Sequence, residues 1–241
     1  MYQCVECGAP ALYACGACGS AFYCGVACQR THWRVHGAAA PLGSELAARS
    51  RPRIVAYTTA VDASARSGAE SEQSFAAQVA ATLQDARGWR RYGCHFVALD
   101  GARPGASPAV APPGTALRVR VVLVSAAVAA RACGQPGFSC WLAGSSAGRG
   151  VIAINYANWM GLSASRLPLA RYRHYVINHE MGHALGLGHG TCAPTRCQRF
   201  WGAGRACPAS VMQQMTRGPA HVAPCVESEW PLDPGAGGEL R

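Results

Sequence analysis

The stretch from residue 179 to residue 189 constrains this chain most, because it reads H-E-x-x-H-x-x-G-x-x-H. On a helix, residues four apart lie nearly above one another, so His179 and His183 can present imidazoles to one metal ion. Glu180 lies about 60° around the helix from His183. Its carboxylate can therefore reach a metal-bound water without binding the metal.

The third histidine, His189, requires the helix to stop, since a continued helix would carry it about 9 Å further along the axis. Gly186 suits this stop because glycine accepts the left-handed C-cap conformation. We therefore predict a chain reversal at Gly186 that brings His189 back as the third ligand. Three imidazoles and one open coordination position are typical of catalytic zinc.

A methionine-containing segment, 210–214, follows the motif and reads S-V-M-Q-Q. From His179 to Met212 the chain resembles the metzincins, zinc peptidases in which a Met-turn lies beneath the metal. The resemblance implies that Met212 forms this floor, with Met215 as the rival. Gln214 stands where many metzincins have Tyr, and its amide N–H could aid the oxyanion instead.

The resemblance to metzincins also implies a fold and a reaction. The fold is an α+β domain with a mixed sheet and an active-site helix. The reaction is endopeptidase hydrolysis, in which Glu180 acts as general base on a water bound to the catalytic Zn²⁺. The substrate is then a protein or peptide.

The first 40 residues form a separate cysteine-rich module. It contains two C-x-x-C pairs and a further Cys/His series, namely Cys4, Cys7, Cys15, Cys18, Cys24, Cys28, His32 and His36. So short a segment cannot bury enough surface to fold alone, so bound metal must stabilise it. Disulfides are the alternative, but C-x-x-C spacing favours zinc.

Tyr23-Cys24, Cys28-Gln29 and His32-Trp33 make this module similar to a MYND zinc finger. That family has two interleaved zinc sites and binds protein partners, often Pro-rich ones. The resemblance implies a first site made of Cys4, Cys7, Cys24 and Cys28. It implies a second site made of Cys15, Cys18 and His36. Ala40 stands where the second site usually has its last cysteine. His32, a water or an outside group could complete it.

The chain divides into four parts on composition. We predict a finger over 1–40, a Gly/Ala/Pro/Ser-rich linker over 41–53, a peptidase-like domain over 54–235 and a flexible tail over 236–241. A short helix over 45–49 is an alternative within the linker.

Hydrophobic patterns place the elements of the large domain. We expect strands over 54–59, 94–99, 117–125 and 151–155, a proline-rich loop over 101–114, and helices over 71–87 and from about 167–171 through the motif. Residues 151–155 are our candidate for an edge strand that pairs with extended substrate, with an internal strand as the alternative. His174 lies roughly 140° from the face of His179 and is not expected to bind metal.

From about 54 to 234 the chain also resembles a bacterial metzincin-like family of unknown function. This resemblance rests on Arg87-Gly88-Trp89, on residues 172–189 and on residues 211–214. Cys192 and Cys225 flank the last of these segments. Members appear exported. The resemblance suggests three disulfides, Cys133–Cys140, Cys192–Cys225 and Cys197–Cys207, with Cys94 left over; a second metal site is the alternative.

Composition limits the remaining classes of function. The chain is 50% hydrophobic and 14% charged, which excludes disorder. Its net charge of +10 is spread along the sequence without interleaved aromatic residues, so nucleic-acid binding is not favoured. No apolar run could span a bilayer and no export signal precedes the finger. We therefore expect an intracellular protein, in cytoplasm or nucleus; disulfides would favour secretion.

Two functions stand out. The first is a zinc endopeptidase that recruits protein partners through its finger. The alternative is a catalytically weak or inactive adaptor, which the absence of Tyr at Gln214 favours. The intact residues of the zinc motif, His179, Glu180, His183 and His189, favour the peptidase.

Overall fold

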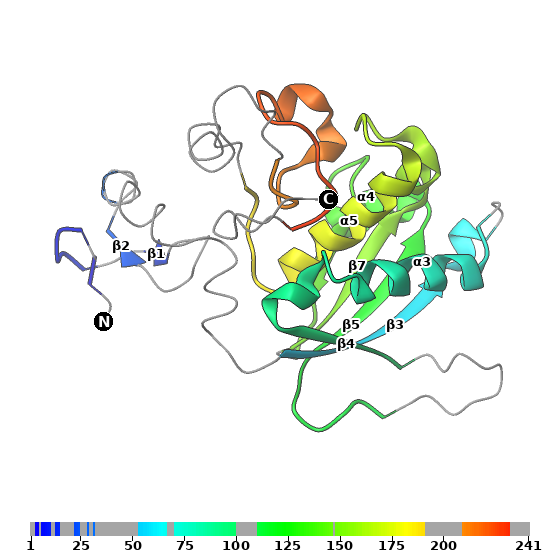
Figure 1. The fold of residues 1–241 in the computed structure, drawn as a ribbon, viewed down its shortest axis with the longest axis horizontal. Helices are drawn as coiled ribbons and strands as arrows, with labels where there is room; N and C mark the ends of the chain where they lie inside the picture. The colour runs from blue at the N-terminus through cyan, green and yellow to red at the C-terminus, as the bar shows by residue number, and fades with distance from the viewer. Residues whose placement is uncertain are drawn as a thin grey trace.

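The structure is a computed structural model, and Figure 1 shows its arrangement. It describes residues 3–4, 6–10, 13–14, 22–24, 28, 31, 53–66, 70–99, 110–146, 148–190 and 209–231. The predicted tail and all but the last residue of the predicted linker lie outside these ranges. In the finger, β1 (Tyr13–Ala14) and β2 (Phe22–Tyr23) form a small antiparallel pair.

The large domain is built on a five-stranded sheet with the order β4-β3-β5-β7-β6. The strands are β3 (Arg53–Val61), β4 (Cys94–Ala98), β5 (Thr115–Val124), β6 (Cys140–Ala143) and β7 (Arg149–Asn155). Four of them are parallel, whereas β6 runs antiparallel to β7 at one edge. The predicted mixed sheet is therefore present. Helices alternate with strands along the chain, so this is a mixed α/β domain, whereas the predicted α+β class describes segregated elements.

Residues 151–155 are not an edge of the sheet, so the alternative that we gave for them, an internal strand, is confirmed. β7, which contains residues 151–155, lies between β5 and β6 and is internal. The two edge strands are β4 and β6, and β6, which has four residues, lies next to β7. It is too short to give an alternating pattern, so the sequence did not reveal it.

Two helices, α3 (Glu72–Gln84) and α5 (Leu169–Ala184), pack on one face of the sheet and enclose the main core. Figure 1 shows both in front of the strands. α3 buries the predicted stripe of Phe75, Val79 and Leu83. It ends earlier than predicted, with Asp85 as its C-cap. α4 (Ala126–Cys133) covers part of the other face, against β5 and β7.

α5 is enclosed on several sides, which explains how polar residues of the zinc motif come to be buried. It begins at Leu169, within the predicted window. Nine of its 16 residues are buried, among them His179 and Glu180. Residues 209–231 pack against it, and their Val211, Met212 and Met215 belong to the same core cluster. Two short turns, η4 (Met215–Arg217) and η5 (Pro219–His221), lie within this segment.

A disulfide joins Cys133, at the end of α4, to Cys140, at the start of β6. This is the pairing that the family resemblance suggested. Cys225 is also disulfide-bonded. Cys192, its predicted partner, and the predicted pair Cys197–Cys207 lie outside the described residues. Cys94 is free and buried, consistent with its place as the unpaired cysteine.

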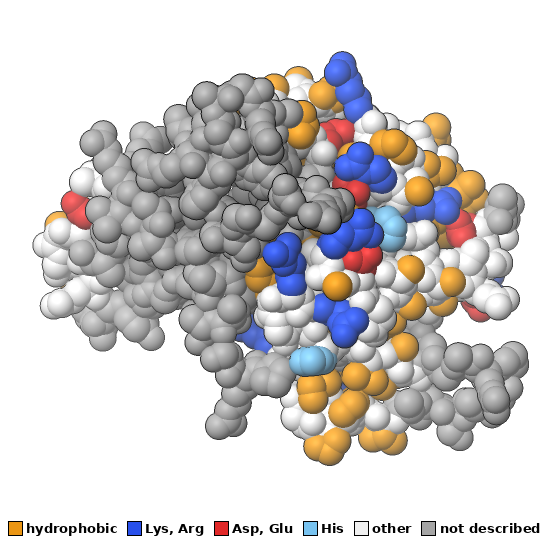
Figure 2. Space-filling view, viewed as in Figure 1, with side chains coloured by type: hydrophobic (Ala, Val, Ile, Leu, Met, Phe, Trp, Pro, Cys, Tyr) orange, Lys and Arg blue, Asp and Glu red, His pale blue; other side chains and the backbone are white. Residues whose placement is uncertain are grey.

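Two surface findings complete the description. Figure 2 shows arginine side chains spread over the visible face, several beside acidic ones, and not gathered into one block. Within the described ranges, no helix combines the length and apolar composition that crossing a membrane requires.

Candidate metal centre

The end of α5 reverses the chain through Gly186. The φ angle of Gly186 is +95°, in the left-handed region. The N–H of Leu187 donates to the carbonyl of Gly182, and the N–H of Gly186 donates to that of His183, both at 2.9 Å. These two bonds define a Schellman motif, which ends the helix where the sequence predicted.

The reversal brings the three predicted imidazoles together. The Nε2 atom of His183 lies 3.2 Å from Nε2 of His179 and 3.1 Å from Nε2 of His189. A tetrahedral zinc ion with Zn–N bonds of about 2.05 Å holds its nitrogen ligands about 3.3 Å apart. The three nitrogens therefore have the spacing that one metal ion requires, and they form one of the two candidate metal clusters among the described residues.

The tautomers of two imidazoles also fit a cation. Nδ1 of His179 lies 2.7 Å from the carbonyl oxygen of Val211, and Nδ1 of His183 lies 2.7 Å from that of Leu187. Each Nδ1 must carry a proton to donate to its carbonyl, so in the neutral ring each Nε2 bears a lone pair. Lone pairs that face each other at this distance repel unless a cation lies between them.

Burial keeps these rings neutral. It lowers the pKa of His179 to about 3, with further lowering by the neighbouring His183. Burial likewise lowers the pKa of His183 and of His189. Metal ligation requires the unprotonated imidazole, so the surroundings favour the binding form.

The segment around Met212 forms hydrogen bonds that hold the histidines in place. Besides the contact of Val211 with His179, the carbonyl of Met212 accepts the N–H of Gly190 at 2.8 Å. The N–H of Gln213 donates to the carbonyl of Ser210 at 2.9 Å, which closes the turn. This turn therefore orients one ligand directly and fixes the chain next to another.

Met212, and not Met215, packs against α5 at Gly182, between the predicted ligands His179 and His183. Any Cβ atom at Gly182 would overlap the Sδ atom of Met212 and crowd the ring of Trp89. Gly182 lies directly before His183, so the thioether packs against α5 next to a predicted ligand. Met215 is also fully buried in the core, but its N–H donates to the hydroxyl of Tyr175.

Tyr175 is a positioning residue that the sequence did not single out. Its hydroxyl donates to the carbonyl of Gln213 at 3.0 Å and accepts the N–H of Met215 at 2.9 Å. The same oxygen lies 3.4 Å from Nδ1 of His179. Tyr175 precedes His179 by one helical turn, and this spacing was the available signal.

Glu180 faces a cavity of about 640 Å³ next to the three histidines. Its Oε2 atom is buried and has no hydrogen-bond partner among the described residues. Burial raises the pKa of Glu180 to about 8, against the opposing effect of the Trp141 backbone N–H. Gln214 and Thr216 line the same cavity, as do Phe138, Trp141 and the disulfide of Cys133 and Cys140.

His174 lies outside the metal cluster, as predicted. Its Nδ1 atom is 2.9 Å from the hydroxyl of Thr82, and its ring packs against Trp230 with centroids 4.8 Å apart. It therefore connects α5 to α3 and to the C-terminal segment.

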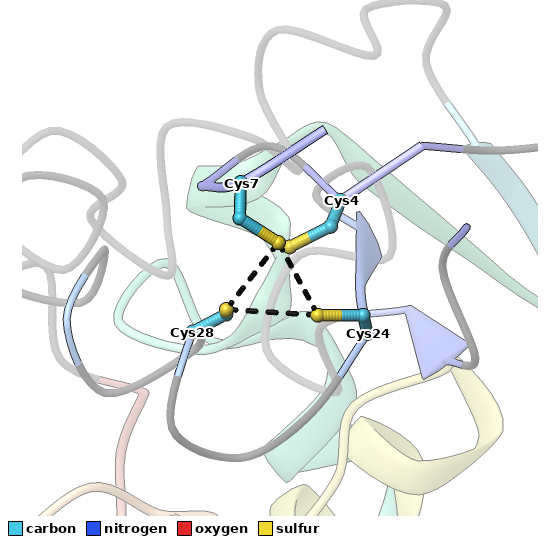
Figure 3. Close-up of side chains that lie close together, drawn as sticks. All are labelled: Cys4, Cys7, Cys24 and Cys28. Atoms are coloured by element: carbon cyan, nitrogen blue, oxygen red, sulfur yellow. Dashed lines mark hydrogen bonds between the residues drawn. The ribbon is translucent and has the colours of Figure 1, made fainter. Parts of the chain in front are cut away.

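Four cysteines in the finger form the second candidate metal cluster, which Figure 3 shows. The Sγ atom of Cys7 lies 3.4 Å from that of Cys24 and 3.6 Å from that of Cys28. A tetrahedral zinc with Zn–S bonds of about 2.3 Å spaces its sulfurs about 3.8 Å apart. Burial opposes ionisation of Cys4, but backbone N–H groups of Cys24 and Cys7 lower its pKa to about 6.

These are the four residues predicted for the first structural zinc site. The residues predicted for the second site, Cys15, Cys18 and His36 with His32 as a possible fourth ligand, lie outside the described residues, so that site stays a prediction.

Comparisons with known families match both parts of the chain. Residues 4–39 match the MYND finger, a zinc-binding module for protein interaction. Residues 23–218 match a family described as "Protein of unknown function (DUF3152)". No curated protein and no solved structure gives a significant match. The chain therefore carries an N-terminal MYND finger and belongs to the DUF3152 family of proteins of unknown function.

Proposed function

We propose that this protein is a zinc-dependent endopeptidase. One observation carries the proposal: the Nε2 atoms of His179, His183 and His189 converge beside the buried Oε2 of Glu180, which has no hydrogen-bond partner in the part of the chain that the structure describes. Three neutral nitrogen ligands leave one coordination position open, which is typical of catalytic rather than structural zinc sites.

Zinc held by three imidazoles lowers the pKa of a bound water to about 7 and polarises a carbonyl group. The protein must supply a base close to that water and a place for the peptide. His179 and His183 are held in the required tautomer by the carbonyls of Val211 and Leu187. These contacts orient the rings and raise their basicity as ligands.

Glu180 is the general base of the proposal. Glu180 is the residue directly after His179, and it lines the same cavity as the three histidines. Its raised pKa, caused by burial, matches a group that takes a proton near neutral pH and returns it to the leaving amine. Gln214 also lines the cavity, where its side-chain amide N–H could donate to the oxyanion.

The substrate of the proposal is an extended peptide that lies along β6. This strand is one of the two edges of the sheet, and its residues Cys140 and Trp141 line the cavity beside the histidines. An edge strand offers unpaired backbone groups to a peptide, which favours addition of the substrate as a further strand. This role replaces the one that we considered for residues 151–155.

The finger provides the second part of the proposed function. MYND fingers bind protein segments, so the module would recruit a protein partner, Pro-rich segments being the first candidates. A polypeptide substrate would then be held at two places on the chain, which raises its effective concentration at the cavity.

The decisive experiment compares the zinc-loaded chain with its Glu180→Gln variant. Both should contain the same amount of zinc, because Glu180 is not a ligand. The unsubstituted chain should cleave casein or fluorogenic peptides and stop when zinc is chelated, whereas the variant should lose at least about 100-fold in rate. Equal activity in both would remove Glu180 from the mechanism. Absence of cleavage by the zinc-loaded chain, with partner binding retained, would favour the adaptor.

A further inference from the structure

One arginine, Arg217, lies beside two segments that line the cavity. Arg217 is the last residue of η4 and follows two wall residues, Gln214 and Thr216. Its guanidinium carbon lies 5.1 Å from the centre of the ring of Phe138, which also lines the cavity. Phe138 belongs to the loop that the Cys133–Cys140 disulfide closes.

Arg217 has no carboxylate partner among the described residues. The four ion pairs in these ranges involve Arg66, Arg87, Arg171 and Arg173 instead. Stacking on an aromatic ring orients a guanidinium but leaves the N–H groups at its edge able to donate. The side chain is exposed, so a ligand in the cavity can reach it.

Arg217 lies next to residues that line the same cavity as the three histidines. Thr216, directly before it, and Phe138, whose ring it contacts, are both among these residues. A group bound along these walls is therefore within reach of the guanidinium. Among the described residues that line the cavity, Glu180 supplies the one acidic side chain, and it serves as the base.

We propose that Arg217 recognises a carboxylate of the peptide substrate, within a few residues of the scissile bond. The carboxylate is either the free C-terminus of the peptide or the side chain of an Asp or Glu. This inference rests on the proposed peptidase function and specifies its substrate class. The planar guanidinium matches a carboxylate with two parallel hydrogen bonds, which a neutral amide cannot form.

The contact between Arg217 and Phe138 adds a geometric reason. It joins the turn after Met212 to the loop before β6, so the two walls touch at this end of the cavity. An extended peptide advances about 3.3 Å per residue. A chain bound along β6 would therefore meet Arg217 soon after it passes the histidines, and a terminal or side-chain carboxylate could bind there.

The test uses four peptides that share one cleavable sequence. They end in a free carboxylate or an amide, and carry Glu or Gln close to the cleaved bond. Cleavage is measured with the zinc-loaded full chain, with Arg217→Gln and Arg217→Lys, and with Arg91→Gln as the control. Arg91 is an exposed arginine on η2 (Trp89–Tyr92), away from the cavity walls.

The expected result is a 10- to 100-fold higher kcat/KM for a carboxylate peptide than for its neutral counterpart, about the effect of one charged hydrogen-bonding pair. The preferred peptide identifies whether the terminal or the side-chain carboxylate is bound. Arg217→Gln should abolish the preference mainly through KM, Arg217→Lys should keep part of it, and Arg91→Gln should keep all of it. An equal preference in Arg217→Gln and the unsubstituted chain overturns the inference, as does no preference in either.

A binding measurement separates this inference from the peptidase proposal. Peptide affinity is measured by fluorescence polarisation in the Glu180→Gln background, with and without Arg217→Gln. A carboxylate-dependent affinity that Arg217→Gln reduces about tenfold supports the role of Arg217 even where turnover fails. Turnover without any such dependence supports the peptidase and overturns the role of Arg217.

Discussion

The Nδ1 atom of His179 lies 2.7 Å from the carbonyl oxygen of Val211, thirty-two residues further along the chain. This contact joins the ligand-bearing helix to the turn that contains Met212. It sets the tautomer of the ring and points Nε2 towards His183. The geometry of the cluster therefore depends on where the turn is held, and Tyr175 holds it.

Tyr175→Phe tests this support. The substitution removes the hydroxyl that donates to Gln213 and accepts from Met215, so two buried backbone groups lose a partner. We expect a loss of about 1–3 kcal/mol in the free energy of unfolding and roughly tenfold weaker zinc binding. Chemical denaturation and a competitive zinc chelator measure the two effects. Tyr172→Phe is the matched control, because its hydroxyl contacts Thr216 and not the turn backbone. Equal zinc affinity in both variants would contradict the role of Tyr175.

Gly182→Ala tests the packing of Met212 on α5. Alanine normally favours a helix by about 1 kcal/mol over glycine. Here its methyl group would overlap Met212 and press on Trp89, so we expect a net loss of about 1–3 kcal/mol in stability. Thermal unfolding of Gly182→Ala, of Met212→Ala and of the double variant gives a double-mutant cycle. The double variant should be more stable than the sum of the two single effects predicts, and strict additivity would refute the overlap.

The zinc motif was the most predictable part of this protein. Its spacing alone predicted the helix, the reversal at Gly186 and the approach of His189 to the other two ligands, because each depends on local backbone geometry. The same applies to α3, whose stripe of Phe75, Val79 and Leu83 is a local pattern. A regular hydrophobic period over about a dozen residues is enough to predict a helix and its buried face.

The missed features depend on contacts between distant segments. β6 is defined by its pairing with β7, and its four residues carry no period of their own. Arg217 and Phe138 meet only because the turn after Met212 and the loop before β6 are neighbours in space. The strand 151–155 was recognised as a strand, but its place inside the sheet was set by β6, which the sequence did not reveal.

His189→Ala tests the metal centre directly. The full chain should lose about one zinc ion per molecule, because two imidazoles alone bind the ion weakly. The finger should keep its metal, since its four cysteines belong to a separate cluster. Mass spectrometry under native conditions measures the ratio, with His174→Ala as the control at a histidine that contacts Thr82. Unchanged zinc content in His189→Ala would contradict the assignment of this ligand.

Replacing both Cys133 and Cys140 by serine tests the loop that carries Phe138. The disulfide closes a loop with a sequence separation of 7. For a loop this short, chain entropy predicts a loss of about 2.5 kcal/mol on removal. Thermal unfolding of the double variant should show this loss relative to the unsubstituted chain. Cys94→Ser is the control, because Cys94 is free and buried. Stability that does not respond to the double substitution would contradict a structural role for this bond.

The ion pair of Arg171 and Glu229 should make stability depend on acid pH. Burial raises the pKa of Glu229, but the two hydrogen bonds and charge of Arg171 outweigh it and lower the pKa overall. The folded state therefore favours the charged carboxylate. Its contribution is present above the unfolded value of about 4.3 and is lost as pH falls through the lower folded value.

Arg171→Gln should accordingly cost on the order of 1 kcal/mol at neutral pH, since Arg171 is half exposed. The difference between the variant and the unsubstituted chain should shrink as the pH falls below 4 to 5, about the range where Glu229 protonates. Denaturant titrations between neutral and acid pH measure it. Arg66→Gln is the matched control, because both partners of the Arg66–Glu72 pair are largely exposed. A difference that stays constant at all pH values would show that Arg171 stabilises the fold through packing and not through the charge of Glu229.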